Sequence, residues 1–382
     1  MPGVLVTDGM QRKSLAAVRA LGRAGMRVVA ASRSGFAASL FSRHAERAHL
    51  PPPAAGEKAL ARRTARLCLQ RDLDVILPME EDTLLALCRH RRLLPPGVRL
   101  PFPGTERIEE ARDKARVLER ALALGLPVPR TVFPGQDVPP DFPLPAVVKP
   151  VLGSGAVGLR FASSKEGLSR ASEEAAKRFG RFLVQERLPR EGEGLGVSVL
   201  MGDKGRVHAL FTHRRLREYP VSGGASTLRE SAREPGAEEA SIRLLRSFDW
   251  RGPAMVEFKR DARDGSLRLM EVNPRFWGSL ALAVEAGVNF PLLLARLARG
   301  EDPGPPPGYR LGVRARWLLP GDLLHFLRNP ARFRLEPSFF RFLEDDLHYD
   351  VLDARDPWPA LGTVLSFLPF LLDPDLRRFL RR

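Results

Sequence analysis

The chain has 382 residues, of which 44% are apolar and 28% are charged. These proportions exclude a globally disordered protein, and the length is enough for two or three compact units. The net charge is +16, but its arginines are spread along the whole chain, so it predicts anionic ligands rather than a specific nucleic-acid partner. Only eight of the 61 basic residues are lysines, which indicates positions where a compact, flexible cation is needed.

The first hundred residues alternate between strand and helix patterns. Residues 3–7, 27–31 and 74–78 read as short buried strands, and helical patterns cover 14–21 and the stretch through Leu84 and Cys88. This order predicts a parallel sheet with helices on its faces. The first strand is not followed by G-x-G-x-x-G, so no dinucleotide site is predicted.

The middle of the chain reads as two further units. After helices within 106–124, a proline-rich segment at 131–144 marks a boundary. The second unit has a strand ending at 147–149, a helix at 166–179 and a strand at 182–185. The third has strands at 196–201, 206–212, 254–259 and 267–272 and a helix near 238–248, and the turn Asp264-Gly265 joins its last two strands.

A glycine loop follows the strand that ends at Lys149. Gly153, Gly155 and Gly158 let the backbone turn tightly, and successive N–H groups in such a loop can bind phosphate oxygens. An ordinary hairpin turn explains the loop alone equally well, and no Gly-Lys-Ser/Thr follows it. The lysine just before the loop favours a phosphate site.

Two glutamates lie on the last predicted strand pair. The turn at Asp264-Gly265 lies near the midpoint between Glu257 and Glu271, so pairing the strands brings these carboxylates together. Carboxylates on apolar strands need a cation or donors to neutralise them. Asn273 faces the same side as Glu271 and adds a neutral oxygen, which predicts a Mg²⁺ site. Arg275 can hold an anion beside it.

An arginine run lies between these motifs. Arg214 and Arg215, followed by the turn at Gly223-Gly224, fit either a bound substrate carboxylate or a solvated basic strand. The basic neighbours of His213 oppose its protonation.

Cysteines and apolar runs carry no further signal. Cys68 and Cys88 define neither a disulfide framework nor a metal cluster, so we expect buried, reduced thiols. No run approaches the roughly 20 apolar residues of a membrane span. The chain starts on a strand pattern rather than a signal peptide, and the expected location is cytoplasmic.

Together, the motifs resemble those of the ATP-grasp superfamily, with the closest likeness to the branch of the carbamoyl-phosphate synthase large subunit. The likeness covers about residues 1–300 and is carried by residues 112–114, 147–150, 184–186 and 271–275, in the order and spacing of that family. It implies an α/β and α+β fold. The implied parts are a Rossmann-like pre-ATP-grasp domain (1–112), a small lobe (113–187), a large lobe with the metal site (188–300) and a C-terminal helical extension (301–382).

The resemblance also implies residue roles. Lys149 and Arg275 would be catalytic, Arg275 by stabilising the transferred phosphoryl group. The metal would be one or two Mg²⁺ ions, or Mn²⁺, on Glu257, Glu271 and Asn273. The nucleotide would contact Lys114 and Lys149 through its phosphates, Gly153, Ser154, Gly155 and Gly158 as a lid, Gln185, Glu186 and Leu188 at adenine, and Glu193 or Glu191 at ribose. Arg214, Arg215, Gly223 and Gly224 would contact the substrate.

The implied activity is that of an ADP-forming ligase. A small-molecule or peptide carboxylate would become an acyl phosphate and then react with an amine, or with a thiol. The alternatives are a carboxylase or carbamoyl-phosphate-synthase-like enzyme that activates bicarbonate or carbamate, and a non-catalytic ATP-binding regulatory protein. A homodimer is compatible with the resemblance.

Overall fold

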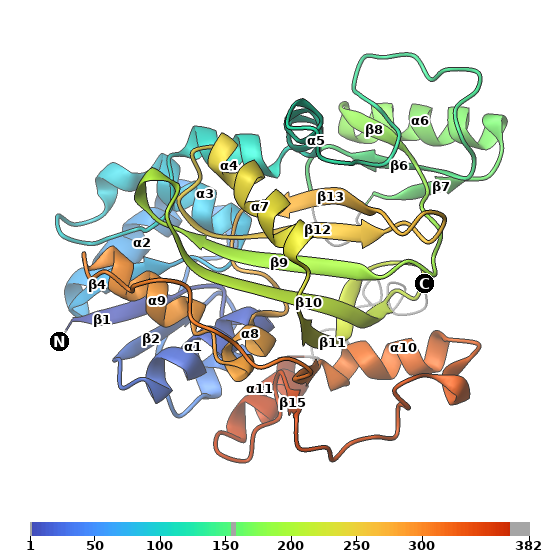
Figure 1. Cartoon of the computed structure of the whole chain (residues 1–382). Helices are drawn as coiled ribbons and strands as arrows, with labels where there is room; N and C mark the ends of the chain where they lie inside the picture. The colour runs from blue at the N-terminus through green and yellow to red at the C-terminus, as the bar shows by residue number, and fades with distance from the viewer. Residues whose placement is uncertain (1, 154–157, 367–382) are drawn as a thin grey trace.

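The computed structural model describes residues 2–153 and 158–366, which form three sheets and the helices that cover them (Figure 1). The N-terminal unit is the parallel sheet that the sequence predicted, in the order β3-β2-β1-β4. Its strands are β1 (Gly3–Val6), β2 (Val28–Ser32), β3 (Glu46–His49) and β4 (Leu73–Leu77), and its helices are α1 (Arg12–Arg23), α2 (Gly56–Gln70) and α3 (Glu81–Arg89).

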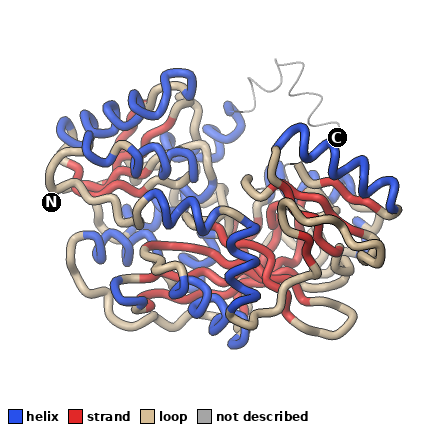
Figure 2. The backbone as a smooth tube through the Cα atoms, turned by 90° about the horizontal axis from the view of Figure 1, so that it is seen from above, coloured by secondary structure: helices blue, strands red, loops and turns tan. Residues whose placement is uncertain are grey.

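The second sheet forms a small lobe with its own core. The order is β5-β8-β6-β7, and α6 packs against it. Its core residues, among them Val148, Leu168 and Val184, form a cluster separate from the core of the rest of the molecule. In both views this lobe lies at the opposite end from the N-terminus (Figures 1 and 2). Its elements are β5 (Thr131–Val132), β6 (Ala146–Pro150), β7 (Arg160–Ala162), α6 (Lys165–Phe179) and β8 (Phe182–Glu186).

Two short helices lead from the N-terminal sheet to the small lobe. They are α4 (Thr105–Arg112) and α5 (Lys114–Ala123). Asp113 separates them, since its side chain accepts hydrogen bonds from the backbone N–H groups of Ala115 and Arg116 and so caps α5. This cap fixes Lys114 as the first residue of α5.

The largest sheet has the order β13-β12-β9-β10-β11-β14-β15. The predicted strands are present, but β10 runs to Tyr219 and pairs with β11, so Ser222 to Gly224 form the connection of a hairpin. The elements from the predicted third unit are β9 (Gly194–Met201), β10 (Val207–Tyr219), β11 (Ala225–Ala232), α7 (Pro235–Ser247), β12 (Gly252–Arg260), β13 (Leu267–Asn273), α8 (Leu280–Ala286) and α9 (Phe290–Ala298).

The sequence led us to expect a helical extension after residue 300, but this segment also contains strands. It holds α10 (Leu323–Arg328) and α11 (Trp358–Ser366), but it also adds β14 (Arg314–Arg316) and β15 (Leu347–Tyr349) to the large sheet. Arginines obscure the strand pattern of β14. The Arg316 side chain is buried because Asp322 accepts its Nε–H at 2.6 Å, and Asp322 also pairs with Arg217. Residues 367–382 of the predicted extension lie outside the described residues.

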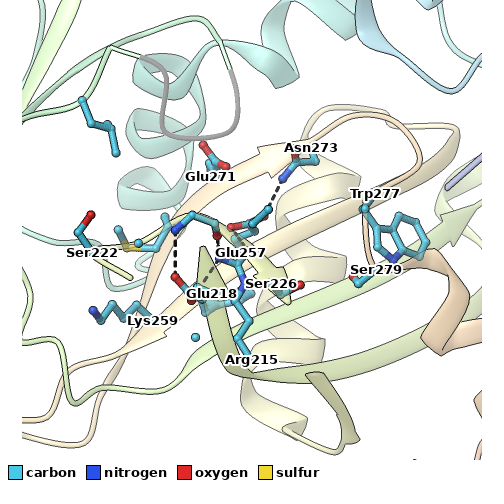
Figure 3. A pocket seen from close by; sticks show the side chains of 18 of the residues that line it. Arg215, Glu218, Ser222, Ser226, Glu257, Lys259, Glu271, Asn273, Trp277 and Ser279 are labelled. Carbon is cyan, nitrogen blue, oxygen red and sulfur yellow. Dashed lines mark hydrogen bonds and ion pairs between the residues drawn. The ribbon is translucent and has the colours of Figure 1, made fainter. Parts of the chain in front are cut away.

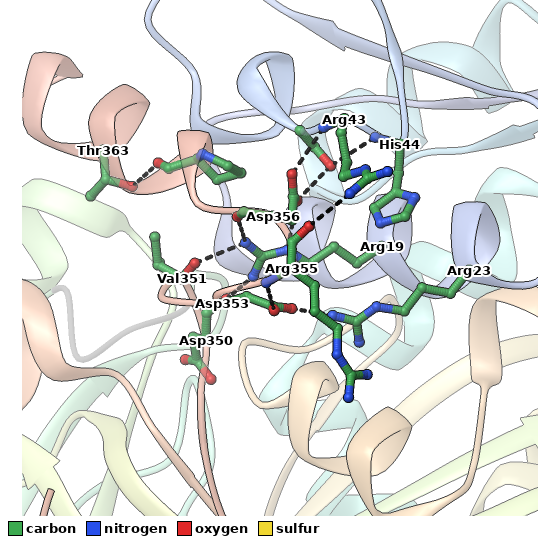
Figure 4. A network of polar contacts seen from close by, with 12 residues as sticks. Arg19, Arg23, Arg43, His44, Asp350, Val351, Asp353, Arg355, Asp356 and Thr363 are labelled. Atoms are coloured by element: carbon green, nitrogen blue, oxygen red, sulfur yellow. Dashed lines mark hydrogen bonds and ion pairs between the residues drawn. The ribbon is translucent and has the colours of Figure 1, made fainter. Parts of the chain in front are cut away.

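Asp356 ties the C-terminal segment to the N-terminal unit (Figure 4). Its fully buried carboxylate accepts hydrogen bonds from Arg19 Nε at 2.9 Å, Ser42 Oγ at 2.8 Å and the backbone N–H of Arg43 at 2.9 Å. Burial acts to raise the pKa of Asp356, but these donors together hold the pKa below the ordinary carboxyl value. Arg19 belongs to α1, so the segment around Asp356 is fixed to the first helix.

Both thiols are free, as expected, but only one of them is fully buried. Cys68 is buried and Cys88 is half-buried, both are free, and burial raises their pKa values to about 12 and about 11. Among the described residues, no single helix has the length and apolar character to cross a bilayer, and α8 and α9 pass such a test only as a pair bent by 91°.

Replacing Asp356 by asparagine should destabilise the fold by about 3 kcal/mol, because Arg19 would lose its buried counter-charge. Asp353→Asn is the control, since Asp353 pairs with the partly exposed Arg23 and should contribute less than about 1 kcal/mol. Urea unfolding measures both variants. Because the folded pKa of Asp356 is lowered, its contribution is present above the unfolded carboxyl pKa and is lost as the pH falls through the folded value. Equal effects of both variants would contradict this interpretation.

Candidate active site

A cavity of about 1010 Å³ is lined by residues of the small lobe, the large sheet and α1. Its size suits a ligand as large as a nucleotide together with a second molecule. Most residues that the sequence analysis selected line this one cavity: Lys114, Lys149, Gly153, Gln185, Glu186, Leu188, Glu191, Glu193, Arg215, Gly223, Gly224, Glu257, Glu271, Asn273 and Arg275.

Four selected residues are not placed there. Arg214 does not line the cavity, because adjacent residues of a strand face opposite sides and its guanidinium pairs with Glu230 at 2.5 Å. Gly158 is also absent from the lining; its φ is +82°, and a Cβ there would lie 2.8 Å from the ring of Phe179. Ser154 and Gly155 lie outside the described residues.

The two predicted carboxylates face each other. Glu257 and Glu271 are register partners on β12 and β13. Each has a cation beside it, since Glu257 pairs with Arg215 at 2.5 Å and Glu271 with Lys114 at 3.2 Å. Burial, reinforced by Glu271, raises the pKa of Glu257 above the ordinary value. Burial acts the same way on Glu271, but Lys114 and Lys149 bring its pKa below that value. The two glutamates therefore titrate as a pair.

Asn273 completes an oxygen-rich set with the glutamates. Its Nδ2 donates to Glu257 Oε1 at 3.0 Å, which leaves its amide oxygen available to a cation. No group of three or more His, Cys, Asp or Glu side chains suited to a metal occurs within residues 2–153 and 158–366. Two carboxylates and an amide nevertheless fit Mg²⁺, which usually takes its remaining ligands from phosphate oxygens and water.

Lys149 lies on β6 of the small lobe with its ammonium group buried. Its Nζ donates to Gln185 Oε1 at 2.8 Å, and the Gln185 amide nitrogen donates to Thr131 Oγ1 at 2.8 Å. Burial, together with the nearby Lys114, lowers the pKa of Lys149 to about 8, while Glu271 opposes this shift. Lys149 is therefore largely protonated at pH 7, and Gln185 orients it toward the cavity.

Lys114 links the carboxylates to the glycine loop. Its Nζ contacts Glu271 and donates to the backbone oxygen of Gly153 at 2.5 Å, while its backbone N–H bonds to the oxygen of Val151 at 2.9 Å. One lysine side chain thus lies between the large-lobe carboxylates and the small-lobe loop.

The connector between the lobes is fixed by backbone contacts. A Cβ on Gly192 would lie 1.8 Å from the backbone oxygen of Arg260, so no other residue fits there. The carboxylate of Glu186 accepts from the backbone N–H of Arg130 and pairs with Arg263 at 2.9 Å. Glu191 and Glu193 both line the cavity, so the choice between them for ribose stays a prediction.

His213 is buried and neutral. Burial, followed by the charges of Arg215 and Arg229, lowers the pKa of His213 to about 3, in the direction that its basic neighbours predicted. Its Nε2 lies 3.3 Å from Ser279 Oγ. His213 is therefore uncharged at neutral pH.

Sequence reasoning missed the wall of the cavity beyond Asn273. In Figure 3, Trp277 and Ser279 lie on one side of Glu257, and Lys259 and Ser222 lie on the other. The scarcity of lysine was a usable signal, because four of the eight lysines line the cavity and the other four are exposed. The missed lining residues include Gln11, Arg12, Lys13, Glu80, Glu218, Ser226, Lys259, Trp277, Gly278 and Ser279.

Comparison with known proteins gives partial sequence matches. Residues 178–319 match a family described as "ATP-grasp in the biosynthetic pathway with Ter operon". The carbamoyl phosphate synthase large chain of Methanosarcina barkeri is 24% identical over 218 residues, which cover 53% of this chain and 20% of that one. D-alanine--D-alanine ligase of Aquifex aeolicus is 25% identical over 185 residues, 46% of this chain and 62% of the ligase. The chain thus matches about a fifth of the length of the synthase.

Solved structures share the fold. The biotin carboxylase domain of the 2-oxoglutarate carboxylase from Hydrogenobacter thermophilus, described as a dimer in complex with MgADP, ADP and bicarbonate, has a TM-score of 0.64 at 19% identity. The likeness covers 82% of this chain and 73% of that one. Residues 178–319 thus resemble an ATP-grasp family, and the wider likeness to the biotin carboxylase domain is one of fold, which agrees with the prediction from the motifs.

Proposed function

We propose that the protein is an ADP-forming ligase that activates a carboxylate with Mg-ATP and joins it to an amine. The observation that carries the proposal is the convergence of Glu257, Glu271, Lys114 and Lys149 on one cavity. This set can neutralise the phosphates of a nucleotide and hold its divalent ion. The names of the carbamoyl phosphate synthase and D-alanine--D-alanine ligase relatives support the same chemistry.

The lobes would share the nucleotide between them. Lys149 and Lys114 would contact the phosphates, and the connector from Gln185 to Leu188 would line the adenine site, with Glu193 or Glu191 at ribose. Glu257, Glu271 and Asn273 would hold Mg²⁺, which, when bound, neutralises phosphate charge. Arg215 and Lys114 contact the glutamates in this structure. With a nucleotide bound, the same two cations would also neutralise part of the phosphate charge.

The reaction would have two displacements. A carboxylate oxygen of the acid attacks the γ-phosphorus, the bond to the β–γ bridging oxygen breaks, and ADP leaves. The amine nitrogen then attacks the acyl carbon, the carbon–oxygen bond to phosphate breaks, and nitrogen loses a proton. Arg275 would stabilise the charge on the transferred phosphoryl group. The small lobe would exclude water from the acyl phosphate when it closes.

Bicarbonate is a second candidate acid, because the biotin carboxylase neighbour binds it. A larger acid is favoured by the cavity, whose lining continues past Asn273 to Lys13 and Trp277. A cytoplasmic location and a homodimer belong to the proposal as well, and sizing of the purified protein tests the dimer.

ADP release that depends on the acid is the direct test of the function. With ATP and Mg²⁺, we expect ADP to form when the correct acid is supplied from a panel that includes bicarbonate. Hydroxylamine in place of the amine should capture the acyl phosphate as a hydroxamate, which mass spectrometry identifies. Nucleotide binding without ADP release for any acid would favour the regulatory alternative, and release with bicarbonate alone would favour the carboxylase.

The variant Glu271→Gln should lower the rate of ADP release at least about 100-fold, because it removes a charged metal ligand from the centre of the site. Glu239→Gln changes an exposed glutamate on α7 and should leave the rate unchanged. Retained turnover in Glu271→Gln would remove this residue from the proposed metal site.

The variant Lys149→Gln should weaken MgADP binding about tenfold, since it loses a charge-assisted contact to phosphate. The measure is the rise in melting temperature with MgADP concentration, compared with Lys177→Gln, an exposed lysine of the same lobe. Unchanged binding would mean that Lys149 acts only through its contact with Gln185.

A further inference from the structure

A second group of basic residues lines the cavity beyond Asn273. Lys13 Nζ and Arg275 Nη1 both donate to the backbone oxygen of Phe276, at 3.2 and 2.9 Å. Two cations therefore share one neutral acceptor. Lys13 also pairs with Glu80 at 3.0 Å, but no carboxylate pairs with Arg275 in the part of the chain that the structure describes. An anion between Lys13 and Arg275 would relieve their repulsion.

The N-terminus of α1 lies at the same part of the cavity. Gln11, Arg12 and Lys13 line the cavity, the N-cap residue Gln11 makes no side-chain capping bond, and the first turn holds no acidic residue. Such a helix end presents free N–H groups and a partial positive charge. Gly278 lies against it, since a Cβ there would come within 3.4 Å of Arg12 Nη2.

Two buried donors in the segment beside this helix end have no partner. Among the described residues, Arg275 Nε and Trp277 Nε1 have no hydrogen-bond partner, although the exposed fractions of these residues are only 7% and 0%. Both residues line the cavity. Unsatisfied buried donors are costly, so these nitrogens indicate a ligand that accepts hydrogen bonds.

This group is distinct from the charges of the nucleotide site. The pKa of Lys13 is lowered to about 8 by burial and then by Arg275, with Glu80 and Asp8 opposing. The pKa of Glu271 responds instead to Lys114, Lys149 and Arg215. Arg275 stands between the two groups, beside Asn273 in sequence and beside Lys13 in space.

We propose that this region, formed by the N-terminus of α1, Lys13, Arg275 and Trp277, binds a second anionic group of the acid substrate. The substrate class is then a carboxylic acid that carries a further carboxylate or phosphate. The carboxylate to be activated lies at Arg275 and the metal site, and the second group lies toward α1. This inference rests on the proposed ligase function for its substrate, but the anion site itself can be tested without turnover.

The test compares matched acids that differ in one anionic group. Glutarate and 4-phosphonobutyrate carry a second anion, and butyrate does not. Calorimetry with the MgADP-saturated protein should show binding of at least one dianionic acid about 10- to 100-fold tighter than that of butyrate. The preferred dianion distinguishes carboxylate from phosphate recognition. Lys13→Gln should abolish the preference, and Lys58→Gln, an exposed lysine on α2, should keep it.

A second variant separates anion binding from folding. Gln11→Glu puts a carboxylate at the uncapped N-terminus of α1, where it should maintain or raise the melting temperature through the helix dipole. The same carboxylate should repel the second anion and weaken dianion binding about tenfold or more. A stable Gln11→Glu protein that keeps the full preference for the dianion would overturn the proposal.

The outcomes separate the two proposals. Dianion binding that Lys13→Gln and Gln11→Glu weaken supports the anion site even if no acid gives ADP, in which case the ligase function fails alone. ADP release with butyrate and glutarate at equal kcat/KM, together with equal binding, overturns the anion site and leaves the ligase function intact.

Discussion

The pair of carboxylates on β12 and β13 is the constraint that organises the site. Glu257 and Glu271 face one another on a largely buried surface, so cations must surround them. These cations come from three places: Lys114 begins α5, Arg215 lies on β10, and Lys149 lies on β6 of the small lobe. These electrostatic interactions therefore bring together segments that are far apart in the sequence. The same cations and carboxylates suit a bound triphosphate and its metal ion.

The two hydrophobic cores divide the molecule into two parts around this charged centre. The small lobe packs around its own cluster, whereas the N-terminal unit and the large sheet share a single core. The small lobe also contributes Val151 and Leu183 of β8 to that shared core, while its other core residues pack within the lobe. Such a division fits closure of the small lobe over a ligand, while the N-terminal unit and the large sheet stay together as one body.

Local patterns predicted much of the fold and the centre of the site. The alternating strands and helices gave the N-terminal sheet, and the turn at Asp264-Gly265 predicted that Glu257 faces Glu271. Adjacent residues of β10 face opposite sides, but the sequence did not show which of Arg214 and Arg215 faces the cavity, so both were selected. The strand β14 was missed because carboxylates of other segments neutralise its arginines: Asp322 pairs with Arg316, and Glu230 and Glu344 pair with Arg314. Lys13 needed tertiary structure, since its neighbour Arg275 is far away in the sequence.

The C-terminal segment that carries β14, β15 and Asp356 also limits how this fold can change in evolution. The C-terminal segment crosses back to complete the large sheet with β14 and β15, and its Asp356 then fastens α1. The first helix and the last described strands thus form one mechanical unit, although the small lobe and most of the large sheet lie between them in the sequence. A recombination event that replaced only the N-terminal unit would leave Asp356 buried without Arg19. Changes at this end of the cavity should therefore arise by point substitutions along α1, or by exchange of the N-terminal unit together with the C-terminal segment.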